Sequence, residues 1–133
     1  MNTHEEKLSI LSELIAFARA DDVIKVSEYK FLLDIATQLG VDKETFDALF
    51  HHKAAKVILK PQSERIVQFH RLLLLMNVDR EQHESELHRL HTIGLRMGLP
   101  PTAIDQVLRV MHQYPDKVVP PNVLINIFKA HYN

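Results

Sequence analysis

Two short acidic segments carry the residues of this sequence with the clearest potential for chemistry. The first contains Asp21, Asp22 and Glu28, and the second contains Asp79 and Glu86. Carboxylate oxygens are the ligands that Ca²⁺ and Mg²⁺ prefer in proteins. A carboxylate at the C-terminal end of a helix, where Asp21 and Asp79 are expected, is destabilised by the helix dipole unless a hydrogen bond or a cation compensates it. The segments therefore allow two interpretations, which are turn chemistry alone and a divalent metal site.

The metal hypothesis has limits that the sequence itself sets. Neither segment has the alternating acidic residues, the glycine at the sixth position and the glutamate at the twelfth that make an EF-hand loop. Lys25 lies inside the first segment and would oppose a cation. Water would have to complete the coordination shell, so we expect any binding of Ca²⁺ or Mg²⁺ to be weak.

The histidines are the second group that could bind metal, because the chain has nine of them. Glu84, His88 and His91 are spaced four and three residues apart, which places them on one face of a helix and permits zinc binding. The two halves of the chain align at an offset of 58 residues, as described below. In that alignment His88 and His91 correspond to Lys30 and Leu33, so the first half has no matching set. We interpret these histidines as solvated or partly buried side chains.

The composition argues against an enzyme. The chain has no cysteine, and its three glycines, Gly40, Gly94 and Gly98, are not clustered in any loop. A thiolate nucleophile and a phosphate-binding glycine loop are therefore absent. The five serines lie in no nucleophile motif. We predict a protein without catalytic activity.

Charge and hydropathy bear on the cellular location of the protein and on the classes of partner that it can bind. Sixteen basic residues against seventeen acidic ones give a net charge of -1, which offers no positive field for a nucleic acid. No apolar run approaches the ~20 residues that cross a bilayer, and the start of the chain is acidic where a secretory leader would be basic. We expect a cytoplasmic protein with no nucleic-acid partner and no membrane insertion.

Apolar residues recur at helical spacing in both halves of the chain. The two halves align when each residue is compared with the one 58 positions later, as Asp21 is with Asp79. Intervals of three and four residues place the apolar residues on one face of an amphipathic helix. Identical residues in this register include Asp21/Asp79, Ser27/Ser85 and Gly40/Gly98. Glycine at the end of a helical pattern is typical of the C′ position, and serine before one is typical of the N-cap. The apolar sets of the first pair of helices are Leu8, Leu11, Ile15 and Ala18 against Ile66, Phe69, Leu73 and Met76.

These patterns predict seven helices and no strand. We expect an all-α protein in which residues 1–133 form a single domain, with two three-helix repeats at about residues 8–60 and 66–118 and a C-terminal closing helix. Residues 54–60 either extend the third helix or form a connector. The expected helices lie near residues 4–20, 27–39, 43–53, 63–77, 85–97, 101–113 and 121–132.

The first acidic segment and its flanks resemble the tellurite-resistance TerB-like domains. The pattern is Ala18-Arg19-Ala20-Asp21-Asp22-Val23-Ile24, followed by Ser27-Glu28 and then Leu39-Gly40, with a second copy at Asp79, Ser85-Glu86 and Met97-Gly98. The resemblance covers about residues 8–110. Asp22 and Arg80 stand where the family usually has glycine. The resemblance implies an all-helical intracellular domain, linked to stress and tellurite resistance, whose acidic residues are suggested to bind metal and which has no established catalytic activity.

Two functions follow as expectations. The first is a non-catalytic TerB-like domain that binds a divalent ion through Asp21, Asp22, Glu28, Asp79 and Glu86. The alternative is a helical interaction module that binds a protein partner or forms a homo-oligomer, without a metal site. The absence of a catalytic set favours this alternative, and so do apolar residues near the end of the chain, namely Val118, Val119, Ile125 and Phe128.

Overall fold

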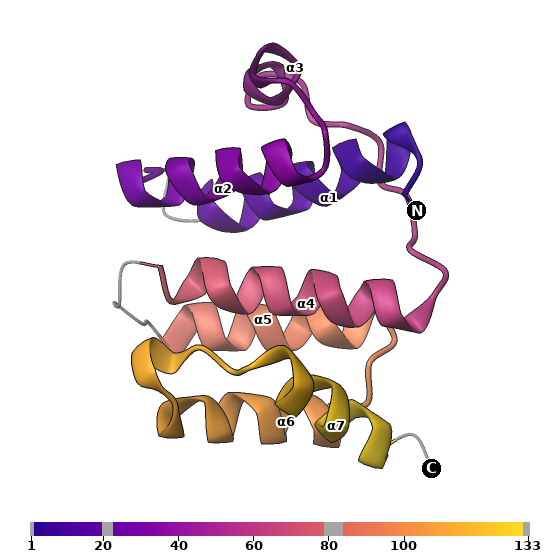
Figure 1. Cartoon of the computed structure of the whole chain (residues 1–133), viewed down its shortest axis with the longest axis vertical. Helices are drawn as coiled ribbons and strands as arrows, with labels where there is room; N and C mark the ends of the chain where they lie inside the picture. Colours follow the sequence, from indigo (N-terminus) through magenta and orange to yellow (C-terminus); the bar gives the residue numbers. More distant parts are fainter. Residues whose placement is uncertain (1, 20–22, 79–83, 132–133) are drawn as a thin grey trace. The chain divides into compact units, whose positions relative to one another are not determined.

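The computed structural model describes residues 2–19, 23–78 and 84–131 (Figure 1). These residues form α-helices, short 3₁₀ helices and irregular segments, with no β-strand among them, so the all-α prediction is confirmed. Within the same ranges, no helix has the length and apolar character to cross a membrane. The chain divides into two compact units, Met1–Lys60 and Pro61–Asn133, which are described separately.

Unit 1 (Met1–Lys60) consists of α1 (His4–Ala18), α2 (Val26–Gln38) and the short α3 (Lys43–Ala48). The start of α1 is fixed by a capping box, in which the Thr3 hydroxyl accepts from the Glu6 N–H at 3.1 Å and the Glu6 carboxylate accepts from the Thr3 N–H at 2.8 Å. Helix α2 packs against both α1 and α3. In Figure 1, α1 and α2 lie side by side. Apolar side chains of the three helices form a core that includes the fully buried Leu11, Leu14, Leu32 and Phe46.

Residues 54–60 form an extended connector, which settles the alternative that the sequence left open. The hydroxyl oxygens of Ser9 and Ser12 on α1 accept hydrogen bonds from the N–H groups of Val57 and Ala54, both at 2.9 Å. These contacts hold the connector against α1 in unit 1. The prediction that the third helix runs to residue 53 is wrong, because α3 ends at Ala48 and turns follow it.

The described residues of unit 2 (Pro61–Asn133) form four α-helices and two short 3₁₀ helices. Helix α4 packs against α5 and α7, and α6 also packs against α5 and α7 (Figure 1). The core includes Phe69 from α4, Ile104 from α6 and Phe128 from α7, all fully buried. The elements are α4 (Gln62–Met76), α5 (Glu84–Arg96), α6 (Pro101–Val110), η2 (Met111–Gln113), η3 (Pro115–Lys117) and α7 (Pro121–His131).

The ends of α2 and α5 confirm the role predicted for the two terminal glycines. Gly40 and Gly98 both have φ of 78°, a left-handed conformation that glycine adopts without steric cost. The next residue in each case bonds back into the helix, from the Val41 N–H to the Ala36 carbonyl oxygen at 2.9 Å and from the Leu99 N–H to the Gly94 carbonyl oxygen at 3.1 Å. This is the Schellman geometry.

The serine N-cap prediction is wrong at both predicted positions. Helix α2 begins at Val26 with Lys25 as its N-cap, so Ser27 lies in the first turn. The Glu28 carboxylate accepts from the Lys25 N–H at 2.9 Å and provides half of a capping box. Helix α5 begins at Glu84, which places Ser85 inside the helix as well.

Candidate functional site

The predicted metal ligands are only partly described. Asp21, Asp22 and Asp79 lie outside the described residues. Glu28 lies in α2, where its carboxylate accepts a hydrogen bond from the Lys25 N–H. Glu86 is half-buried and lies in α5, which belongs to the other unit. No cluster of three metal-ligating side chains occurs among the residues that the structure describes. The divalent metal site therefore stays a prediction.

Calorimetry with Ca²⁺, Mg²⁺ and Mn²⁺ tests this metal hypothesis on the wild type and on the Asp21→Asn/Glu28→Gln variant. The hypothesis predicts weak binding, detectable at millimolar ion and lost in the variant, because Lys25 opposes the cation and water must complete its shell. Absence of binding heat in the wild type, or equal binding by the variant, would leave these carboxylates as turn and cap residues. The variant would then lose roughly 0.5–2 kcal/mol of stability.

Three histidines of unit 2 contact neighbouring segments. His91 Nε2 lies 3.0 Å from an Asp105 carboxylate oxygen, which links α5 to α6. His70 Nε2 lies 2.9 Å from the Val119 carbonyl oxygen, which links α4 to the segment before α7. His131 lies 2.9 Å from the Thr102 hydroxyl and 2.7 Å from the Gln106 amide oxygen. Sequence reasoning missed these pairings, because each partner belongs to a different element of the unit.

The C-terminal apolar residues that favoured an interaction surface do not form one together. Val119 and Phe128 are fully buried in unit 2, whereas Val118 and Ile125 are about 40% exposed. Phe128 packs edge-on against Phe69 with ring centroids 6.0 Å apart. The expectation that all four residues contribute to an interface is therefore wrong for the two buried ones, since the core of unit 2 uses their side chains.

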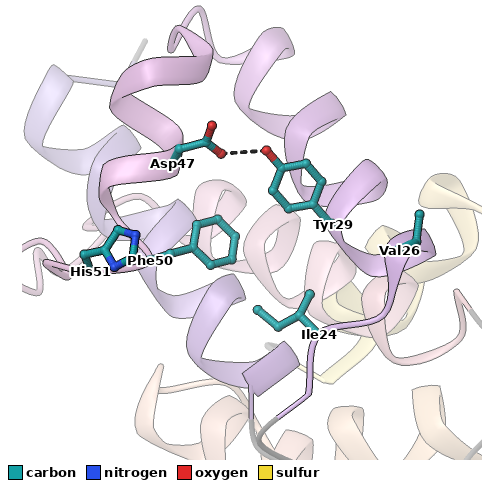
Figure 2. A pocket seen from close by; sticks show the side chains of 6 residues that line it. All are labelled: Ile24, Val26, Tyr29, Asp47, Phe50 and His51. Atoms are coloured by element: carbon teal, nitrogen blue, oxygen red, sulfur yellow. Dashed lines mark hydrogen bonds between the residues drawn. The ribbon is translucent and has the colours of Figure 1, made fainter.

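A pocket of about 600 Å³ in unit 1 is a candidate functional site. Figure 2 shows Ile24, Tyr29 and Phe50 pointing toward one another in this unit 1 pocket. They come from the segment before α2, from α2 and from the turn after α3. The complete lining is Ile24, Val26, Tyr29, Asp47, Phe50 and His51.

Aromatic rings form the rigid side of the unit 1 pocket. Tyr29 and Phe50 have ring centroids 5.8 Å apart, and both contact the fully buried Phe46, at 5.6 Å and 5.2 Å. The Arg19 guanidinium lies 5.4 Å from the centroid of the Phe50 ring and donates to the Phe50 carbonyl oxygen at 2.7 Å. Contact with a buried ring and with a guanidinium restrains both pocket-lining aromatics.

A polar network lies at one edge of the pocket, and Figure 2 shows its hydrogen bond between Asp47 and Tyr29. The Asp47 carboxylate accepts from the Tyr29 hydroxyl and from Lys43 Nζ, both at 2.6 Å. The hydrogen bonds from Lys43 and Tyr29 lower the pKa of Asp47, and the bond to Asp47 raises the pKa of Lys43. The bond to Asp47, together with burial, raises the pKa of Tyr29. At neutral pH the network therefore holds an ionised Asp47, a charged Lys43 and a protonated Tyr29.

This arrangement is suited to binding an apolar group. Val26, which lines the pocket, is 71% exposed, and Val23 just outside it is 66% exposed. Helical spacing places Tyr29 and Phe50 on the apolar faces of their segments, but the structure leaves both half-buried. The available signal was the apolar run Val23-Ile24 and Val26 in a segment between helices, where polar residues are the norm.

Searches of protein-family models, of curated proteins and of solved structures found no match to this chain. The observed features define a helical protein with an open, aromatic-walled pocket in its first unit. The TerB-like relationship stays a prediction from the sequence pattern.

Proposed function

We propose that this chain is a non-catalytic helical interaction module whose unit 1 pocket receives an apolar side chain of a protein partner. The observation that carries this proposal is the exposure of Val23 and Val26 beside a preformed aromatic pocket. Contiguous apolar surface in contact with water is unfavourable, and a partner side chain that covers it releases that cost. Helical grooves of this kind commonly bind amphipathic segments.

The expected energetics fit a side chain that anchors a larger contact. Burying one leucine-sized side chain contributes about 1.5–3 kcal/mol, which alone gives only weak association. Restrained aromatic walls limit the entropy lost on binding, because Tyr29 and Phe50 are already ordered by Phe46 and Arg19. The pocket would therefore act as the centre of an interface that extends over Val23 and Val26.

The Asp47–Tyr29 pair of the pocket is not adjusted for acid–base catalysis. General acid–base catalysis needs a pKa near the working pH. The pKa of Asp47 is lowered and the pKa of Tyr29 is raised, so both move away from neutrality. Each group also satisfies the other through a hydrogen bond. These groups would hold the shape of the pocket.

We infer that α1–α3 and α4–α6 are two three-helix repeats, with α7 as a closing helix, and that binding is specialised in the first repeat. When 58 is added to each residue number, the first and last residues of α1 coincide with those of α4, and those of α2 coincide with those of α5. The first residue of α3 coincides with the first residue of α6. In this register the apolar Ile24 and Val26 correspond to Gln82 and Glu84. The TerB-like, metal-binding function stays the alternative hypothesis, which the calorimetry above would decide.

Selection of random dodecapeptides on phage against the immobilised full chain tests the docking proposal. We expect enriched clones to bind the wild type and to bind Val26→Asp at least about tenfold more weakly, since a carboxylate would enter the apolar contact. The matched control is Ile125→Asp, which places the same charge at an exposed apolar residue of α7. Circular dichroism verifies that both variants are folded.

Two outcomes of the selection would contradict the proposal. One is the absence of clones whose binding depends on Val26. The other is clones that lose binding to Ile125→Asp but keep it with Val26→Asp, which would place the interface on α7.

A further inference from the structure

We propose that the partner segment is acidic, with a carboxylate close to the apolar side chain that enters the unit 1 pocket. This inference rests on the proposed docking function and adds the chemistry of the partner. Its basis is the charge that the described residues leave around the pocket. On the side of Phe50, the described charged group is the Arg19 guanidinium.

The only described carboxylate that lines the pocket is already neutralised. Both oxygens of Asp47 are engaged, one by the Tyr29 hydroxyl and one by Lys43 Nζ, each at 2.6 Å. The lowered pKa of Asp47 and the raised pKa of Lys43 keep this pair ionised, so its net charge is zero. An incoming carboxylate would therefore meet a compensated ion pair at this edge.

Arg19 supplies the uncompensated positive charge. One guanidinium nitrogen donates to the Phe50 carbonyl oxygen at 2.7 Å, and the group lies over the Phe50 ring at 5.4 Å. Arg19 is exposed, and none of the described residues gives it a carboxylate partner. A guanidinium has five N–H donors in a fixed fork, so donors remain for a ligand. An arginine already held in place loses less entropy when it binds a carboxylate.

His51 extends the same edge. Its side chain lines the pocket and is exposed, and no hydrogen bond to that side chain occurs within the described part of the chain. The imidazole can donate a hydrogen bond in either protonation state. A segment with an apolar side chain between Ile24, Tyr29 and Phe50 can therefore direct a neighbouring Asp or Glu toward Arg19 and His51. Asp21 and Asp22, which precede Ile24, lie outside the described residues.

The test uses the peptides enriched in the selection above. We expect clones that depend on Val26 to contain more Asp and Glu near their apolar residues than the unselected library. The most enriched sequence, made as a fluorescent peptide, is then titrated by anisotropy against the full chain. We expect His51→Glu to weaken binding at least about fivefold, since it adds a negative charge at the contact. We expect Arg19→Glu to weaken binding at least about tenfold, since it replaces a positive charge with a negative one.

The matched control is His112→Glu, which makes the same change at an exposed histidine of unit 2 and should leave the affinity within about twofold. Clones that need Val26 but are basic or uncharged would overturn the acidic-partner inference and leave the docking function standing. The inference also fails if His51→Glu and Arg19→Glu, both folded by circular dichroism, bind the peptide like the wild type. Selection without any clone dependent on Val26 would overturn both proposals.

Discussion

Deletion of residues 120–133 is expected to lower the melting temperature of the chain by more than about 10 °C. Helix α7 places three side chains, Leu124, Ile127 and Phe128, in the core of unit 2. Each contributes about 1.5–3 kcal/mol on burial, and the sum is a large fraction of the ~5–15 kcal/mol that stabilises a typical domain. The deletion also exposes the face of Phe69 that contacts Phe128.

Point variants separate this packing effect from the effect of shortening the chain. Phe128→Ala should cost about 3–5 kcal/mol, the usual range for truncation of a buried phenylalanine. Ile125→Ala, on the exposed side of the same helix, should change stability by less than about 0.5 kcal/mol. Calorimetric melting of the deletion and urea titration of the point variants provide the measurements. A deletion that melts like the wild type would make α7 a free arm.

The helices could be predicted from the sequence because each one has a continuous apolar face. The interval of three and four residues between Ile66, Phe69, Leu73 and Met76 is a local property, and all four side chains are buried in α4. Gly40 and Gly98 were predictable for the same reason, since a left-handed helix end is determined by the helix and the residue that follows it. Local signals therefore placed the elements, with errors mainly at their ends.

The connector after α3 could not be predicted, because its conformation depends on residues far away in the chain. Ser9 and Ser12 on α1 accept from the N–H groups of Val57 and Ala54, which are 48 and 42 residues away. In the sequence, these serines are two small polar residues on a helix. Only the folded unit shows that they replace the backbone hydrogen bonds that a longer α3 would have made.

The unit 1 pocket was missed for a related reason. Tyr29, Phe46 and Phe50 have the spacing of core residues, and Phe46 is indeed fully buried. Whether the other two rings are covered depends on what packs beyond them, and the segment that carries Ile24 leaves them half-buried. Helical periodicity gives the face on which a side chain lies, but it does not give the depth of the layer that covers it.

The second large effect is expected for Gly94→Val in α5, with a loss of about 3 kcal/mol or more. A Cβ at this position would lie 2.7 Å from Ile104 Cδ1 and 3.1 Å from Phe69 Cε1. Both neighbours are fully buried, so they have little room to move. Overpacking of this kind typically costs about 1–3 kcal/mol, and the two extra methyl groups of valine add to the clash. Urea titration measures the loss, with Leu95→Val on the exposed side of α5 as the control.

A double-variant cycle with Ile104→Val tests whether the clash with Ile104 is the cause. Ile104→Val removes Cδ1, the atom nearest to the new side chain, and should cost about 0.5–1.5 kcal/mol by itself. If the valine at position 94 competes with Cδ1 for the same volume, the double variant should be more stable than the sum of the two single losses predicts, by about 1 kcal/mol. Additive losses would show that α5 moves away from α6 as a unit, because separated helices no longer compete for that space.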